Sequence, residues 1–159
     1  MAIQEGDKLP EATLHMMQDG RPQPMTTADL FGGKKVVLFA VPGAFTPTCS
    51  QAHLPGYVVN ADAIKAKGVD SIICLSVNDA FVMGAWGDNA NAEALLMVGD
   101  GNGDFTKAVG LEMDGSGFGL GSRSQRYAMV VDDGTVSKLA VEEAGQLDVS
   151  AAEAILQAL

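Results

Sequence analysis

The stretch KKVVLFAV, residues 34–41, contains an unbroken aliphatic run and ends at Pro42 and Gly43. A run without alternating polar positions is typical of a strand whose two faces are both covered. SIICLSV (71–77) is a second run of this kind, and between the two runs apolar residues recur at helical spacing until Gly68. The pattern predicts a parallel strand–helix–strand unit, which requires a sheet with helices on both faces.

The later residues predict a change from parallel to antiparallel pairing, because an Asp-Gly turn at Asp133 and Gly134 lies between two apolar stretches. The expected elements are a helix over 79–90, a strand over 94–98, a short helix over 104–110, a hairpin over 126–142 and a final helix over 150–159. Asn78 or Asp79 should open the first of these helices. Ser150 and Glu153 should form a capping box at the start of the last one. We therefore expect a single α/β domain over 1–159 with a thioredoxin-like fold, in which a mixed central sheet carries helices on both faces. A flavodoxin-like fold is the alternative, and the hairpin argues against it.

Composition and charge exclude several classes of partner. A chain of 159 residues buries enough apolar surface to fold without disulfides. Its formal net charge is −10 and it has no basic run, which argues against binding to nucleic acid or to anionic membrane surfaces. No stretch approaches the roughly 20 apolar residues of a membrane span, and the opening MAIQEGDKLPEA does not resemble a secretory signal. We expect a soluble, cytoplasmic protein.

The two cysteines, Cys49 and Cys74, have the spacing of neither a CxxC motif nor a zinc site. Thr46 followed by Pro47 is typical of a helix start, which makes Cys49 about the third helical residue. Unpaired backbone N–H groups and the helix dipole stabilise a thiolate at such a position. Cys49 is therefore the candidate reactive thiol, whereas Cys74 lies within the second buried strand and is expected to be structural.

Three other functions compete at Cys49. His53 lies four residues further on, so a Cys–His dyad of a hydrolase is one alternative, although Pro55 should disturb the helix between them. A redox-sensing or binding module, in which oxidation of Cys49 signals to a partner, is another. A dithiol oxidoreductase is disfavoured because Ser50, Gln51 and Ala52 follow the cysteine.

The segment VPGAFTPTCSQAHLPGY resembles the peroxiredoxins, most closely the Prx5 (type II) subfamily. The family signature is PxxxTxxC, matched here by Pro42, Thr46 and Cys49. The likeness continues through 63–87 and 123–134, so it covers most of the chain. It implies a thioredoxin fold with an added N-terminal hairpin.

This resemblance implies a peroxidase that reduces hydrogen peroxide and organic hydroperoxides, in a role in antioxidant defence, without a metal or organic cofactor. Cys49 would be the nucleophile and become a sulfenic acid. Thr46 would hydrogen-bond the peroxide, and Pro42 would shield the thiolate. The family arginine precedes an aromatic residue at the start of a late strand, which indicates Arg126, with Arg123 as the near alternative.

One departure from some relatives concerns recycling. Those relatives carry a resolving cysteine near the C-terminus, whereas EEAGQLDVSAAEA (142–154) has none. The resemblance therefore implies reduction by an external thiol, either glutathione with glutaredoxin or thioredoxin. It also implies a homodimer, with residues 78–87 near the contact.

Two glycine-rich segments imitate ligand-binding loops. GDGNGDF (99–105) begins like a calcium loop, but Phe105 and Leu111 stand where glycine and glutamate are required. DGSGFGLGSR (114–123) lacks the lysine and spacing of a phosphate-binding loop. We interpret the first as a polar loop and the second as a flexible loop that leads to the strand after Arg126.

Overall fold

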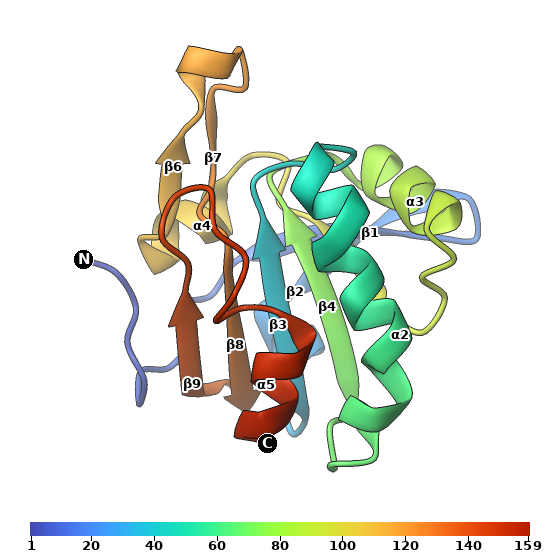
Figure 1. Ribbon diagram of the computed structural model, residues 1–159, viewed down its shortest axis with the longest axis vertical. Helices are drawn as coiled ribbons and strands as arrows, with labels where there is room; N and C mark the ends of the chain where they lie inside the picture. The colour runs from blue at the N-terminus through green and yellow to red at the C-terminus, as the bar shows by residue number, and fades with distance from the viewer.

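The computed structural model describes residues 1–159, and its centre is a seven-stranded mixed sheet (Figure 1). The strand order is β2-β1-β5-β4-β3-β8-β9, in which β3, β4 and β5 are parallel and the other pairs are antiparallel. The strands of this sheet are β1 (Thr13–Gln18), β2 (Arg21–Thr26), β3 (Lys35–Val41), β4 (Ser71–Ser76), β5 (Leu96–Gly99), β8 (Tyr127–Asp132) and β9 (Thr135–Val141). The predicted mixed sheet and thioredoxin-like fold are confirmed.

Helices cover both faces of this sheet, as the apolar run in β3 requires. They are α1 (Thr27–Phe31), α2 (Leu54–Lys65), α3 (Ala80–Asn89), α4 (Asp104–Val109) and α5 (Ala152–Ala158). One core lies between the sheet and α2, α3 and α5; the other lies against α1 and α4. Val37 and Phe39 enter the first core, whereas Val36 and Leu38 enter the second. Alternate residues of β3 therefore pack into the cores on opposite faces of the sheet. Because both faces are covered, β3 has no solvent-facing side that would favour polar residues.

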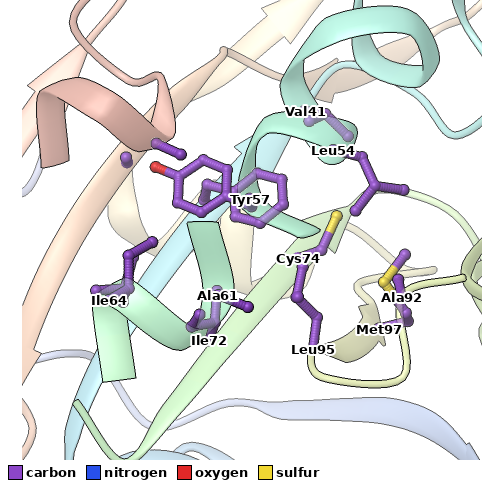
Figure 2. Packing of buried hydrophobic residues seen from close by; sticks show 14 of the residues in the cluster. Val41, Leu54, Tyr57, Ala61, Ile64, Ile72, Cys74, Ala92, Leu95 and Met97 are labelled. Atoms are coloured by element: carbon purple, nitrogen blue, oxygen red, sulfur yellow. The ribbon is translucent and has the colours of Figure 1, made fainter. Parts of the chain in front are cut away.

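The first core holds α2 against the strand that carries Cys74 (Figure 2). Tyr57, Ala61 and Ile64 project from α2 at helical spacing onto Ile72 and Cys74 of β4. The ring of Tyr57 stacks on Phe39 of β3 with a centroid distance of 3.9 Å. This packing fixes α2, and with it the residues at its N-terminal end, relative to the sheet.

Both hairpins of the sheet close through Asp-Gly turns. Asp133 and Gly134 join β8 to β9 with φ angles of 48° and 80°, the left-handed conformations of a type I′ turn. This confirms the predicted hairpin. Asp19 and Gly20 join β1 to β2 in the same way and form the N-terminal hairpin that the family resemblance implies.

Polar residues cap the middle helices. Asp79 accepts a hydrogen bond from Val82 N at the start of α3, which settles the choice between Asn78 and Asp79. The buried carboxylate of Asp100 accepts from the backbone N–H groups of Phe105 and Thr106 and from the Thr106 hydroxyl. The calcium-like segment is thus a turn that caps α4. None of the helices is both long and apolar enough to span a bilayer.

Two local predictions are wrong. The capping box of Ser150 and Glu153 does not form: α5 begins at Ala152, and the Ser150 hydroxyl donates to the Glu142 carboxylate at 2.7 Å. The segment 114–123 is not a plain loop either, because β6 (Glu112–Asp114) and β7 (Ser122–Ser124) pair into a ribbon that projects from the sheet (Figure 1). Strands of three residues are too short to reveal the alternation that identifies a strand.

Candidate active site

The turn after β3 places Cys49 in the first turn of a helix, as the Thr46-Pro47 pair predicts. The Thr46 hydroxyl donates to the carbonyl of Gly43 at 2.7 Å, and helical structure begins at Pro47. Phe45 has a φ of +65°, a left-handed conformation that is uncommon outside glycine and concentrates at functional sites. The side chain of Cys49 is fully buried in the core beneath this turn.

Pro55 changes the helix geometry directly after the cysteine. Residues Cys49–His53 form a π-helical turn in which Leu54 N donates to the carbonyl of Cys49, and α2 continues from Leu54. Because Pro55 has no N–H, it cannot make the bond to the carbonyl of Gln51 that a regular α-helix requires. The predicted disturbance therefore takes the form of a wider turn, a feature often found at functional sites.

Arg126 contacts the sulfur of Cys49 from the residue before β8. Its Nη2 donates to Cys49 Sγ at 3.1 Å, and its Nη1 lies 2.8 Å from Nδ1 of His53. Arg123 instead donates to the backbone carbonyls of Leu120 and Pro42, at 2.9 Å and 3.4 Å. The geometry thus separates the two candidate arginines and places Arg126 at the thiol.

His53 is buried, and both of its ring nitrogens are engaged. Nε2 lies 3.0 Å from the carbonyl oxygen of Ser150, which can only accept, so Nε2 carries the proton. Nδ1 therefore presents a lone pair to the guanidinium of Arg126, which can only donate. Burial first, and the charge of Arg126 second, lower the pKa of His53 to about 4. Neither nitrogen is free to take a proton from Cys49, which argues against the Cys–His hydrolase.

A cleft of about 370 Å³ opens beside this group of residues. Pro42, Thr48 and Arg126 line it, together with Met113 of β6 and Gln125. The cleft gives a small molecule access to the side of the site where the guanidinium lies. No group of three or more His, Cys, Asp or Glu side chains is arranged to hold a metal ion.

Cys74 lies in β4 with its side chain inside the first core (Figure 2). Burial raises the pKa of its thiol, and the nearby Cys49 raises it further. Both cysteines are free thiols. This environment is consistent with the expectation that Cys74 is a structural core residue.

Two contacts at the site are absent from the sequence predictions. Trp86 of α3 donates from Nε1 to the Ser50 hydroxyl at 3.0 Å, one residue after Cys49. Ser150, expected to cap a helix, instead presents its carbonyl to His53. Spacing could not indicate these contacts, because their partners are 36 and 97 residues apart in the sequence.

The buried His53 predicts a pH-dependent stability. In the unfolded chain His53 protonates near pH 6.5, whereas in the folded protein it stays neutral until about pH 4. The contribution of neutral His53 to the free energy of unfolding is therefore complete above about pH 6.5. It is lost as the pH falls from about 6.5 to about 4, by about 3 kcal/mol in total. Urea unfolding at pH 7, 5.5 and 4 should show that the free energy of unfolding falls less with decreasing pH in His53→Asn than in wild type. His15→Asn, at an exposed position on β1, is the matched control; equal losses in all three proteins would contradict the assignment.

Comparison with known proteins supports the fold and identifies the family. A model of the redoxin family matches residues 4–156. Peroxiredoxin-2E-2, chloroplastic, of Oryza sativa subsp. japonica is 54% identical over 164 residues, covering 99% of this chain and 72% of the relative. Peroxiredoxin-2B of Arabidopsis thaliana is 46% identical over 159 residues, covering 99% and 98%. The crystal structure of reduced Prx3 in complex with hydrogen peroxide from Vibrio vulnificus has a TM-score of 0.95 at 60% identity, covering 98% of each chain.

A thioredoxin-like sheet with a buried cysteine at a helix start, bound by an arginine, defines a thiol-based oxidoreductase. The matches extend over almost the whole chain and do not depend on the motif around Cys49 alone. The chain belongs to the peroxiredoxin family, in its type II (Prx5) branch, and is a thiol-dependent peroxidase. The resemblance noted in its sequence is thereby confirmed.

Proposed function

We propose that Cys49 is the peroxide-reducing nucleophile and that Arg126, Thr46 and Pro42 form its site. The observation that carries this proposal is the 3.1 Å contact between Arg126 Nη2 and Cys49 Sγ at a helix start. A fixed cation and the N–H groups of a helix N-terminus both stabilise negative charge that is carried at the sulfur during the reaction. Cys74 has neither neighbour and lies in an apolar core, which favours its protonated form.

In the proposed reaction the Cys49 thiolate attacks one oxygen of the peroxide. The S–O bond forms as the O–O bond breaks, and the second oxygen leaves as hydroxide or alkoxide, which takes a proton from solvent. Cysteine is oxidised to sulfenic acid and the peroxide is reduced by two electrons. Negative charge moves from sulfur to the leaving oxygen, so donors that face both atoms stabilise the transition state.

Each neighbouring residue has a part in this step. Arg126 reaches the sulfur with one N–H and can follow the developing charge with its fixed guanidinium. The Thr46 hydroxyl already donates to the Gly43 carbonyl, so its oxygen is oriented to accept the hydrogen of a peroxide. Pro42 lines the cleft beside Arg126 and contributes no N–H of its own that would compete for the substrate.

Recycling requires two external thiols. The first condenses with the sulfenic acid, releasing water and leaving a mixed disulfide on Cys49, and the second releases the Cys49 thiol as a new disulfide forms between the two reductants. Glutathione with glutaredoxin, or thioredoxin, would supply them. The burial of Cys74 supports an external reductant over an internal one.

We infer a homodimer in the cytoplasm or another reducing compartment. Phe45 beside the site and Phe81 on α3 are 51% and 62% exposed, and such aromatic side chains are typical of protein interfaces. The ring of Phe45 lies 6.3 Å from the ring of Trp86, which is on α3 like Phe81. The exposed Phe45 and Phe81 therefore belong to adjacent elements. Two free cysteines in one domain favour a reducing compartment.

Reaction of the reduced protein with hydrogen peroxide tests the proposed function. One equivalent of peroxide should add one oxygen to Cys49, located by peptide mass, at a rate orders of magnitude above that of free cysteine. Steady-state turnover with glutathione and glutaredoxin, compared with a thioredoxin system, then identifies the reductant. A rate no greater than that of free cysteine, or oxidation located elsewhere, would refute the proposal.

A further inference from the structure

Glu142 is a buried carboxylate with no assigned role in the reaction. It follows β9 directly, and its side chain is only 8% exposed. One oxygen, Oε2, accepts three hydrogen bonds: from Asp148 N at 2.6 Å, Ser150 N at 2.8 Å and Ser150 Oγ at 2.7 Å. A charge is costly to bury unless such bonds compensate it, so the arrangement requires an explanation.

These bonds hold the connection between β9 and α5, which arches beside β8 in Figure 1. They fix both the amide and the hydroxyl of Ser150, and therefore the direction of its carbonyl. This carbonyl accepts from Nε2 of His53 at 3.0 Å and from the Tyr57 hydroxyl at 2.7 Å. The carbonyl oxygen of Ser150 thus accepts one hydrogen bond from the π-helical turn and one from α2.

The Ser150 carbonyl in turn determines what His53 offers to Arg126. Because Nε2 must donate to the carbonyl, Nδ1 is left as an acceptor, and Arg126 Nη1 donates to it at 2.8 Å. The other terminal nitrogen of the same guanidinium then contacts Cys49 Sγ. A continuous chain of hydrogen bonds therefore leads from Glu142 through Ser150 and His53 to Arg126.

The backbone of Glu142 provides a second connection, since its N–H donates to the carbonyl of Arg126 at 2.9 Å. Glu142 therefore acts on Arg126 at both ends, on the main chain directly and on the guanidinium through Ser150 and His53. We propose that Glu142 is a positioning residue for peroxide reduction, which holds the Arg126 guanidinium against the Cys49 sulfur through the Ser150 carbonyl and His53. This inference rests on the proposed roles of Cys49 and Arg126.

The expected consequence is kinetic. Without the Glu142 carboxylate the Ser150 carbonyl is no longer fixed, His53 loses its orientation, and the guanidinium samples positions away from the sulfur. Displacements of about 1 Å caused by remote substitutions can cost up to about 10²-fold in rate. Since the backbone bond to Arg126 remains in a side-chain variant, we expect a loss of about tenfold in the second-order rate constant with hydrogen peroxide.

A double-mutant cycle tests this inference, with Glu142→Ala, which removes the accepting oxygen, His53→Asn, and the combination of the two. Asparagine can place its amide oxygen where Nδ1 lies, but has no atom that reaches the Ser150 carbonyl. If Glu142 acts through His53, the double variant should react with peroxide about as fast as His53→Asn alone. Asp148→Asn is the matched control, because it removes one negative charge from an exposed side chain in the same connection; its rate should equal that of wild type.

The possible outcomes are distinct. An unchanged rate in Glu142→Ala, a full additional tenfold loss in the double variant, or an equal loss in Asp148→Asn would each overturn the inference while leaving the peroxidase proposal intact. A wild-type rate equal to that of free cysteine would overturn both. If Glu142→Ala does not fold, Ser150→Ala removes one of the three bonds and should also lower the rate; an unchanged rate in that folded variant would count against the proposal.

Discussion

Replacing Cys49 by serine is expected to abolish peroxide reduction, with a loss of roughly 10⁴-fold or more, as for removal of other enzyme nucleophiles. A serine hydroxyl is not ionised at neutral pH, so it cannot use the donors that Arg126 and the helix start provide. The side chain is buried and close in size to cysteine, so the fold should survive the exchange. Stopped-flow fluorescence would follow the reaction, because the single Trp86 is hydrogen-bonded to Ser50 beside the reacting sulfur.

Cys74→Ser is the matched control for this experiment. Its side chain lies in β4 within the first core, where a hydroxyl lacks a partner and lowers the free energy of unfolding. The rate constant with hydrogen peroxide should nevertheless stay within a few-fold of wild type, because no proposed step uses Cys74. Comparable losses in the two variants would show that the reaction needs both thiols and would contradict the one-cysteine mechanism.

The second large effect is expected for Arg126→Lys, at about 10²–10³-fold in the same rate constant, as for removal of an oriented donor at comparable sites. Lysine retains the positive charge but has a single ammonium group, whereas the guanidinium spans Cys49 Sγ and His53 Nδ1 at once. The loss therefore measures geometry and not charge. Single-turnover oxidation by hydrogen peroxide, followed at several peroxide concentrations, gives this constant directly.

Arg123→Lys provides the comparison, since it makes the same exchange three residues away. Arg123 donates only to the backbone carbonyls of Leu120 and Pro42, so its replacement should lower the rate by no more than a few-fold. A larger effect in Arg123→Lys than in Arg126→Lys would reverse the assignment of the arginine. The pair also distinguishes a general electrostatic effect from a specific contact, because both variants keep the net charge.

Much of the fold could be predicted from short stretches of sequence. The aliphatic runs of β3 and β4, the Asp133-Gly134 turn and the Thr46-Pro47 helix start each impose a backbone conformation on their own residues. Where a tertiary partner competes with a local one, the prediction fails. Ser150 illustrates this, because the buried carboxylate of Glu142 binds both its amide and its hydroxyl, and α5 begins without the predicted capping box.

The candidate site likewise contains residues that local sequence predicts and residues that it does not. Cys49 could be selected as the candidate thiol from its own neighbours, since it lies about three residues into a helix, where unpaired backbone N–H groups face it. Arg126 is reached from the sequence only through the family resemblance, and the residues around it did not separate it from Arg123. The spacing of Cys49 and His53 suggests a hydrolase dyad, whereas the ring nitrogens of His53 join Ser150 to Arg126.

Local patterns in the sequence were enough to predict most of the elements and to indicate Cys49 as the candidate thiol, because hydrophobic periodicity, turn residues and helix-start residues act over a few positions. The contacts around Cys49, in contrast, depend on the tertiary structure. The pairing of β8 beside β3 brings Arg126 to Cys49 across 77 residues, and the connection after β9 brings Ser150 to His53 across 97. Such contacts depend on the order of strands in the sheet and on how buried polar groups are paired, and no local pattern of residues encodes either.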